Sequence, residues 1–369
     1  MSLKILFPLF INSSKGGMQN VVFDLIEGLN TNGYECEILT FKSSEIIQEC
    51  RLRNINCHAI ASRPMLLLLF FLIQYYYFIF SNNFKIIITN DIYSHILLSL
   101  YPLKKNEIFV SHGGDYKTKD RKHASNSGIS ALIAKYFSFK RISRFIAVSS
   151  TQRYNLITNA FIPSEKVSII ENGVYPIPIN KSKRESDKIR ISIVGYIKPL
   201  KNQEIAIQTL FELKNRGINA ELNIYGSVQD NDYYQKIIHI IQKLQLCENI
   251  KFRGYEKNKT YIYENTDILM SCSHHEGFGL TIIEAMASKV PVIAYKGAEG
   301  PSSIIDNRRT GLLIEENCAN SFADGICEYI NDQDLKDSIC ENAFHLYESK
   351  YSEKKMVENY IKIINICNK

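Results

Sequence analysis

Apolar runs of strand length alternate with helical stretches along most of the chain, and this rhythm constrains the fold more than any other feature. The chain begins with the strand-like run Lys4 to Pro8, continues with the helical stretch Met18 to Leu29, and returns to a strand pattern at Glu35 to Thr40. A strand, a helix and a second strand in this order are typical of a βαβ unit, which builds parallel sheets. The pattern therefore predicts an α/β fold with doubly wound parallel sheets.

The rhythm stops once, in a polar and lysine-rich segment, and then begins again. That segment runs from Pro176 to Lys188, and segments of this composition commonly link domains. A length of 369 residues also exceeds what one hydrophobic core comfortably organises. We therefore predict a Rossmann-like first domain over residues 1–176, a linker over 177–188, a second Rossmann-like domain over 189–350 and a last helix over 351–369.

Further strands and helices are predicted on both sides of the linker from the spacing of apolar residues. Strands are expected at 85–89, 108–111, 144–149 and 167–170 before the linker, and at 189–194, 220–225, 250–253, 268–271 and 290–295 after it. Helices are expected at 202–215, 233–246 and 281–288, and through 321–367 with breaks near 331 and 351.

Two glutamates eight residues apart mark the most informative short segment. Glu276 opens a Glu-Gly-Phe-Gly stretch with turn character, and Glu284 lies in the following run of good helix formers. The N–H groups of a first helical turn have no intrahelical partner, so they attract anions such as a diphosphate. We therefore expect an anion site here, with each carboxylate accepting hydrogen bonds from hydroxyls on either side of it.

Composition and cysteine usage indicate the compartment. Hydrophobic residues make up 45% of the chain and charged residues 22%, as in globular proteins. Nine cysteines occur singly, without a Cys-x-x-Cys pair or histidines at zinc-binding spacing, which is typical of a reducing compartment. The N-terminus lacks the charged lead and apolar core of a signal peptide. We expect a cytoplasmic protein, with attachment to the inner face of the cell membrane left open.

Positive charge is concentrated in the first half of the chain. Residues 1–180 contain 19 Lys and Arg against 12 Asp and Glu, within a total net charge of +6. The basic clusters at 117–122 and 140–144 suit an anionic membrane face or a phosphate-bearing acceptor. Nucleic acid also fits such a surface but is not among the partners we predict, and an ordinary solvated surface explains the clusters equally well.

The most apolar stretch is Met65 to Phe80. A bilayer-spanning helix needs about 20 apolar residues, and this shorter run contains Gln74 and three tyrosines. We therefore reject a transmembrane helix. A buried helix of the first domain is the favoured interpretation, and a membrane-docking face is the alternative.

Several motifs in a fixed order carry a family resemblance. The two glutamates, with Pro291 to Ala294 downstream, resemble the Glu-x7-Glu donor site of family 4 retaining glycosyltransferases of the GT-B fold. Shorter matches extend over nearly the whole chain, at residues 16–17, 33–37, 111–113, 148–149, 171–174, 194–202, 225–226 and 252–254. The resemblance implies two Rossmann-like domains facing each other across a cleft, with the last helix crossing back to the first domain.

The resemblance also implies roles for residues of the second domain. Glu284 would accept hydrogen bonds from the ribose hydroxyls, and Glu276 would lie by the donor sugar and support charge at its anomeric carbon. Sugar hydroxyls and phosphate oxygens would be held by four backbone amides, those of Gly277, Phe278, Gly279 and Leu280.

One part of the diphosphate site departs from the family pattern. Lys201 matches the lysine that meets the diphosphate, but the usual Gly-Arg opening is Gly195-Tyr196 here. Either Lys198 replaces the missing cation or Tyr196 donates a weaker hydrogen bond. Gly226 and Tyr255 complete the expected donor-binding set.

The first domain supplies the remaining candidates. By resemblance, His112 would hydrogen-bond the donor sugar, and Gly17 would offer its amide near the phosphate or the acceptor. Asp115 is a candidate acceptor-side carboxylate. Asp230 and Asp232 form an Asp-x-Asp pair, but their position before a helical run predicts a helix cap, so we expect no metal and no cofactor.

Together these features predict a retaining, metal-independent glycosyltransferase. The expected donor is a nucleotide sugar, with UDP as the favoured nucleotide, because residues 300–305 resemble a segment of transferases for UDP-hexose or N-acetylhexosamine. The expected acceptor is a hydroxyl of a saccharide, with a lipid-linked one favoured, in surface polysaccharide assembly. A sugar-nucleotide epimerase of the same fold and a non-catalytic binding subunit are the alternatives.

Overall fold

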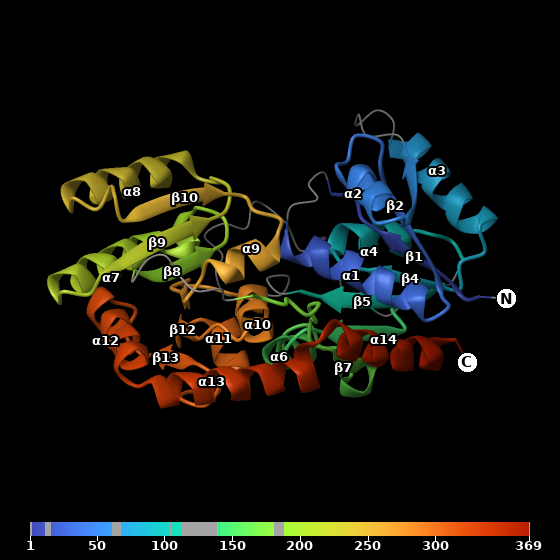
Figure 1. Ribbon diagram of the computed structural model, residues 1–369. Helices are drawn as coiled ribbons and strands as arrows, with labels where there is room; N and C mark the ends of the chain where they lie inside the picture. The colour runs from blue at the N-terminus through green and yellow to red at the C-terminus, as the bar shows by residue number, and fades with distance from the viewer. Residues whose placement is uncertain are drawn as a thin grey trace. The chain divides into compact units, whose positions relative to one another are not determined.

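The chain forms two compact units in the computed structural model shown in Figure 1, which describes residues 2–11, 16–60, 68–103, 105–112, 139, 141–180 and 188–368. Unit 1 comprises Met1–Gly173 with Glu353–Lys369, and unit 2 comprises Val174–Ser352. Asp115, the basic cluster at 117–122 and most of the linker, residues 181–187, lie outside the described residues. Lys140 and the start of the apolar run, residues 65–67, lie outside them as well.

The described part of unit 1 holds a parallel sheet of seven strands in the order β3-β2-β1-β4-β5-β6-β7. The strands are β1 (Lys4–Pro8), β2 (Glu35–Phe41), β3 (Asn56–Ile60), β4 (Ile86–Thr89), β5 (Asn106–Ser111), β6 (Arg144–Ala147) and β7 (Val167–Ile169). The accompanying helices are α1 (Gly17–Thr31), α2 (Ile46–Leu52), α3 (Leu68–Ser81), α4 (Ile92–Ser99), α6 (Ser150–Thr158) and α14 (Glu353–Cys367), with a short turn η2 (Ser164–Lys166). The strand order reverses between β1 and β4, as in Rossmann-like folds.

The central strands of unit 1 are buried on both faces. Ile86, Ile87 and Ile88 of β4 are all 0% exposed, although consecutive side chains of a strand point to opposite faces. A continuous apolar run of this kind is typical of a parallel strand that is covered by helices on both sides.

The last helix belongs to unit 1 because α14 packs directly against α1 (Figure 1). A Cβ atom at Gly28 of α1 would lie only 2.4 Å from a methyl carbon of Val357 in α14. The absence of a side chain at Gly28 therefore lets the two helices approach closely.

The described part of unit 2 holds a second parallel sheet, of six strands, in the order β10-β9-β8-β11-β12-β13. The strands are β8 (Ile189–Val194), β9 (Ala220–Tyr225), β10 (Ile250–Gly254), β11 (Ile268–Ser271), β12 (Val292–Tyr295) and β13 (Leu312–Ile314). The helices are α7 (Gln203–Asn215), α8 (Asn231–Lys243), α9 (Lys259–Glu264), α10 (Leu280–Ala287), α11 (Glu299–Ile304), α12 (Ala319–Asn331) and α13 (Gln333–Leu346), with the turns η3 (Pro199–Lys201) and η4 (Tyr347–Tyr351). Here the order reverses between β8 and β11.

The prediction of an α/β fold with doubly wound parallel sheets is confirmed. The elements that the sequence pattern missed are short or lie at a sheet edge. Two of them are β3 and β13, which end their sheets; β13 has three residues, and exposed and covered side chains mix along β3. Such segments have too few buried positions to produce a strong apolar pattern.

The apolar helix α3 is buried on one face only, at the edge of unit 1 in Figure 1. Tyr75 and Ile79 are fully covered within the core, whereas Phe70 is 49% exposed, Tyr77 70% and Phe80 68%. The favoured interpretation of a buried helix therefore holds for one face of the helix. Within the described residues, no helix is long and apolar enough to cross a bilayer.

The carboxyl ends of β8 and β9 touch through two glycines. Gly226 follows β9, and a Cβ atom there would lie 2.0 Å from the carbonyl oxygen of Gly195, which follows β8. The backbone itself is also tied, since Gly195 N–H donates to Tyr225 O at 2.8 Å and Gly226 N–H donates to Gly254 O at 2.7 Å. The absence of a side chain at Gly226 thus allows the ends of β8 and β9 to pack closely beneath the loop that follows β8.

Replacing Gly226 by Ala should destabilise unit 2 more than replacing Gly217 by Ala. Both glycines have a positive φ, of 142° and 77°, so alanine strains the backbone at each. Only at Gly226 would the new Cβ collide with backbone, because nothing lies within 4 Å at Gly217. We expect denaturant unfolding to show an additional loss of about 2 kcal/mol for Gly226→Ala. Equal losses for the two variants would contradict the close packing of the strand ends.

Candidate functional site

The candidate site of unit 2 lies where the strand order reverses. The loop after β8 and the loop after β11 leave neighbouring strands in opposite directions, and open α/β sheets bind ligands at such a point. The two loops are joined by a backbone hydrogen bond, in which His274 N–H donates to Leu200 O at 3.0 Å. The topology therefore brings together residues that are about 75 positions apart in the sequence.

An ion pair links the two loops. The Lys201 ammonium donates to a carboxylate oxygen of Glu276, and each side chain is 20% exposed. Lys201 reaches across Gly195, where a Cβ atom would lie 3.3 Å from its Cε. The cation predicted for a diphosphate and the carboxylate predicted for a sugar thus form an ion pair with each other.

The loop that carries Glu276 packs closely against the helix α11. Gly300 N–H donates to the Glu276 carbonyl oxygen at 2.8 Å, and a Cβ atom at Gly300 would lie 2.3 Å from the Phe278 oxygen. The Phe278 ring is 6% exposed and packs edge-on against Tyr351 at 6.2 Å. Phe278 therefore anchors the loop with its side chain, and its backbone is fixed in place.

The start of α10 has the form of an anion site. Gly279 is the N-cap with φ 106°, and no side chain caps the helix. The N–H groups of Leu280 and Thr281 in the first turn have no intrahelical acceptor. They follow the loop that ends at Gly279, so the loop-to-helix transition predicted from the sequence is present.

Glu284 lies one turn into α10 and is almost completely buried, with 6% exposure. Its two carboxylate oxygens accept hydrogen bonds from the Lys259 ammonium at 2.6 Å and the Tyr263 hydroxyl at 2.8 Å. Burial, together with the neighbouring Glu284 carboxylate, raises the pKa of Tyr263 well above its usual range, so the phenol stays protonated and donates. A carboxylate has about four acceptor positions, which leaves room for further donors.

Tyr196 stands at the position where the family pattern has arginine, and Lys198 lies beside it. The Lys198 ammonium lies 5.8 Å from the centre of the Tyr196 ring, a distance at which a cation is attracted to the face of the ring. Tyr255, which follows β10, is 43% exposed. The contribution of these two tyrosines to a diphosphate or nucleotide site stays a prediction.

The Asp-x-Asp pair begins a helix. Asp230 is the N-cap of α8, and its carboxylate accepts from the Tyr233 N–H at 2.9 Å. The predicted capping role is confirmed. Among the described residues, no three His, Cys, Asp or Glu side chains gather where they could hold a metal ion.

Unit 1 places its candidate residues after β1 and after β5, and β4 lies between these two strands in the sheet. His112 follows β5, and its Nε2 lies 3.1 Å from the Oδ1 of Asn90, which follows β4. Burial lowers the pKa of His112 to about 4, so the imidazole is neutral at pH 7 and suited to hydrogen bonding. Gly17 is the first residue of α1.

The sequence patterns singled out Lys201 but not the other partners of the two glutamates. Lys259, Tyr263 and Gly300 lie in other loops and helices, and no short motif connects them to Glu284 or Glu276. The one local signal is Asn258, which caps α9 through its side chain and so places Lys259 at a helix start. Asn90, the partner of His112, has no motif of its own.

Two family models match successive parts of the chain. The family described as Glycosyltransferase Family 4 matches residues 15–176, and the one described as Glycosyl transferases group 1 matches residues 177–346. A curated relative is the poly(ribitol-phosphate) alpha-N-acetylglucosaminyltransferase of Staphylococcus aureus, 28% identical over 228 residues, which are 61% of this chain and 44% of the relative. The chain thus spans less than half the length of that relative.

Solved structures share the architecture over the full length of the chain. A glycosyltransferase from Rickettsia africae has a TM-score of 0.84 at 21% identity, covering 100% of this chain and 99% of that one. HepE from Anabaena, in complex with UDP and glucose, has a TM-score of 0.82 at 17% identity, covering 98% and 99%. The family matches account for nearly all of the sequence and these structures for its fold, so the chain belongs to the family 4 glycosyltransferases of the GT-B fold.

Proposed function

We propose that the chain transfers a hexose or N-acetylhexosamine from a UDP-linked donor to a hydroxyl of a saccharide, with retention and without a metal ion. The observation that carries this proposal is the Lys201–Glu276 ion pair beside the uncapped start of α10, with Glu284 one turn further on. A nucleotide sugar consists of a sugar, a diphosphate and a ribose in that order, followed by the base. Glu276 would face the sugar, Lys201 and the first amides of α10 would face the diphosphate, and Glu284 would face the ribose.

The diphosphate would replace Glu276 as the partner of Lys201. A doubly charged diphosphate competes well for an ammonium, and the amides of the first turn of α10 add their dipole. Lys201 would then stabilise the leaving group as charge builds up on it. Lys198, held beside Tyr196, is the nearest candidate for a second cation.

Glu276, released from Lys201, would turn to the donor sugar. Its carboxylate would accept a hydrogen bond from a sugar hydroxyl and stabilise positive charge at the anomeric carbon. In the transfer step the bond from the anomeric carbon to the diphosphate oxygen breaks and a bond to the acceptor oxygen forms on the same face. The acceptor proton passes to the leaving diphosphate, so no carboxylate nucleophile is needed. His112 of unit 1, neutral at pH 7, would donate or accept a hydrogen bond at the sugar.

Glu284 would bind the ribose hydroxyls with the acceptor positions that Lys259 and Tyr263 leave unused. Lys259 offsets the negative charge of a carboxylate that is buried close to a diphosphate site. It also fixes the orientation of the carboxylate. Lys259 is therefore a positioning residue for the nucleotide.

Support for a polysaccharide acceptor comes from the relatives and from the charge of the chain. The relative from Staphylococcus aureus is named for transfer to poly(ribitol-phosphate). The excess of Lys and Arg in residues 1–180 suits an acceptor that carries phosphate, including a lipid-linked one. We place the activity in surface polysaccharide assembly on this basis.

The exposed face of α3 would attach the enzyme to an anionic membrane. Tyr76 of α3 donates to Leu97 O of α4 at 3.2 Å, and α4 leads to Leu100 and Leu103, which are 60% and 52% exposed. The helix α3 contains no charged residue. Exposed aromatic side chains on such a helix suit a lipid surface.

Glu276→Gln should abolish transfer without weakening donor binding. With UDP-glucose and UDP-N-acetylglucosamine as donors and a lipid-linked saccharide pool as acceptor, we expect turnover to fall about 100-fold or more. UDP affinity should stay the same or increase, because Lys201 loses its competing carboxylate. Glu315→Gln, which breaks the surface pair with Lys296, is the control.

The product of the same assay tests the mechanism. The wild-type product should keep the anomeric configuration of the donor, and an inverted product would exclude the mechanism. Product from the donor alone would favour an epimerase, and a wild type that binds UDP without turnover would favour a binding subunit.

Lys259→Met should weaken UDP binding about tenfold, or about 1.4 kcal/mol, while leaving the bound enzyme's turnover nearly unchanged. The reason is that Glu284 loses both its neutralising charge and its orientation. Lys251→Met is the matched control, since Lys251 forms a similar 2.8 Å ion pair with Glu221 on the neighbouring strands β10 and β9. Calorimetric titration with UDP measures both variants, and equal effects would argue against a role for Lys259 at the ribose.

The double variant Tyr77→Ser and Phe80→Ser should reduce binding to vesicles of phosphatidylcholine and phosphatidylglycerol about tenfold or more, because two aromatic side chains no longer enter the lipid. Tyr154→Ser on α6 is the control, as Tyr154 is 65% exposed on another helix. Co-sedimentation measures the bound fraction. Undiminished binding of the double variant would remove α3 from the docking surface.

A further inference from the structure

Asn90 is a buried polar residue that the sequence patterns did not single out. It follows β4, which borders the reversal of strand order in unit 1, and it is 4% exposed. Its amide nitrogen Nδ2 is buried and has no hydrogen-bond partner, and among the described residues His112 is the one partner of the side chain. Buried amides normally satisfy all their hydrogen bonds. An asparagine that is left half-unpaired and holds only a histidine therefore indicates a functional role.

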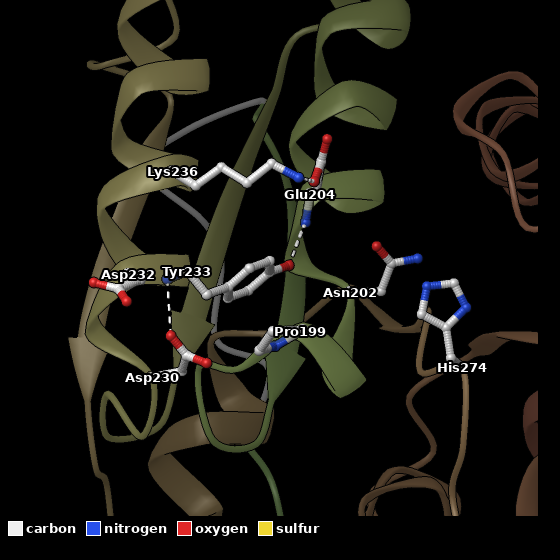
Figure 2. Close-up of a pocket in the computed structure, with 8 residues that line it drawn as sticks. All are labelled: Pro199, Asn202, Glu204, Asp230, Asp232, Tyr233, Lys236 and His274. Carbon is white, nitrogen blue, oxygen red and sulfur yellow. Dashed lines mark hydrogen bonds and ion pairs between the residues drawn. The ribbon is translucent and has the colours of Figure 1, made fainter. Parts of the chain in front are cut away.

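The hollow of about 500 Å³ beside η3 in unit 2 has no such atom (Figure 2). Lys236 forms an ion pair with Glu204 at 2.6 Å, and the Tyr233 hydroxyl accepts from the Glu204 N–H at 3.1 Å. Asp230 accepts from the Tyr233 N–H at 2.9 Å. All residues that line the hollow are described, and none has a buried side-chain atom without a partner. The unpaired amide of Asn90 distinguishes the sheet edge of unit 1 from this hollow.

The hydrogen bond with Asn90 sets the tautomer of His112. The Nε2 atom of His112 lies 3.1 Å from the Oδ1 atom of Asn90. Burial lowers the pKa of His112 to about 4, so the ring is neutral at pH 7 and carries a single N–H. A carbonyl oxygen can only accept a hydrogen bond, so this N–H is at Nε2. The other ring nitrogen, Nδ1, is therefore an acceptor.

Two acidic side chains of the same segments are paired elsewhere. Asp91, next to Asn90, caps α4 by accepting from a backbone N–H at 2.8 Å. Glu107 of β5 accepts from the Thr89 hydroxyl at 2.7 Å. Within the described part of the chain no carboxylate pairs with His112, and burial is the cause of its lowered pKa. Asn90 is thus the described residue that determines which nitrogen of His112 carries the proton.

We propose that Asn90 is a positioning residue for His112, which it holds with Nδ1 as the acceptor for a sugar hydroxyl. The inference rests on the proposed function, in which His112 lies at the sugar, and it adds that this histidine accepts rather than donates. A hydroxyl can donate to Nδ1, whereas the carbonyl oxygen of an N-acetyl group cannot. His112 therefore selects a hydroxyl at the position of the sugar that it contacts.

Nitrogen NMR of the full chain with isotope-labelled histidine measures the tautomer without any substrate. At pH 7 the wild type should show His112 protonated at Nε2, and the loss of its signals in His112→Gln assigns them. Asn90→Leu should lose this preference and show both neutral tautomers. Protonation of wild-type His112 at Nδ1, or an unchanged tautomer in Asn90→Leu, would overturn the proposal.

Transfer kinetics test whether Asn90 acts through His112. Asn90→Leu should lower kcat/KM about tenfold in the wild type and have no further effect when it is added to His112→Gln. The donors and the acceptor pool are those of the assay above. A further loss of transfer in the double variant would show that Asn90 does not act through His112 and would overturn the proposal.

Urea unfolding separates this role from a purely structural one. The midpoint of Asn90→Leu should stay the same or rise, because leucine removes an unpaired buried amide. Asn223→Leu is the matched control: Asn223 is 0% exposed, and its amide accepts from Arg253 at 2.8 Å and donates to Glu221 at 3.2 Å. This control should lower the midpoint, and an equal loss in Asn90→Leu would count against a positioning role.

The outcomes distinguish the inference from the proposed function. If His112 has the expected tautomer but no donor supports transfer, the proposed function fails while the pairing of Asn90 with His112 stands. If Asn90→Leu transfers as well as the wild type, the inference fails while the proposed function stands.

Discussion

The reversal of strand order between β8 and β11 is the constraint on which the candidate site depends. Because the loops after these strands run in opposite directions, the chain leaves an opening at the carboxyl edge of the sheet. Lys201 reaches into this opening from one loop and Glu276 from the other. The close contact of Gly195 with Gly226 keeps the ends of β8 and β9 together. Gly300 packs against the backbone of the loop that carries Glu276. The strand order therefore positions the two loops, and the side chains on these loops form the site.

Each glutamate of the Glu-x7-Glu pair forms an ion pair with a lysine. The two ion pairs offset the negative charge of both carboxylates near the start of α10. In the pair of Glu276 with Lys201, both side chains are partly exposed. Glu284 is buried, and the contacts from Lys259 and Tyr263 hold it in one orientation. The same spacing thus contains one partly exposed carboxylate and one buried carboxylate.

Local patterns predicted much of the fold and part of the site. The isoleucines of β4 are buried on both faces and formed a clear apolar run, whereas β3 and β13 lie at sheet edges and left little signal. The turn at Gly279 and the helix after it were readable because glycine and helix formers act locally. Lys259 was not predictable, since its contact with Glu284 depends on how α9 packs against α10. For α3, hydrophobicity predicted a helix but could not tell which of its faces the core would cover.

The sequence by itself determined the alternation of strands and helices, the point at which it restarts, and the loop-to-helix segment with its two glutamates. These features follow from short-range chemistry, in which each residue acts through its neighbours in the chain. Only the tertiary structure decided which lysine meets which glutamate and that α3 leaves aromatic side chains exposed. Such contacts join residues far apart in sequence, and they exist only once the parallel sheets bring the loops to one edge.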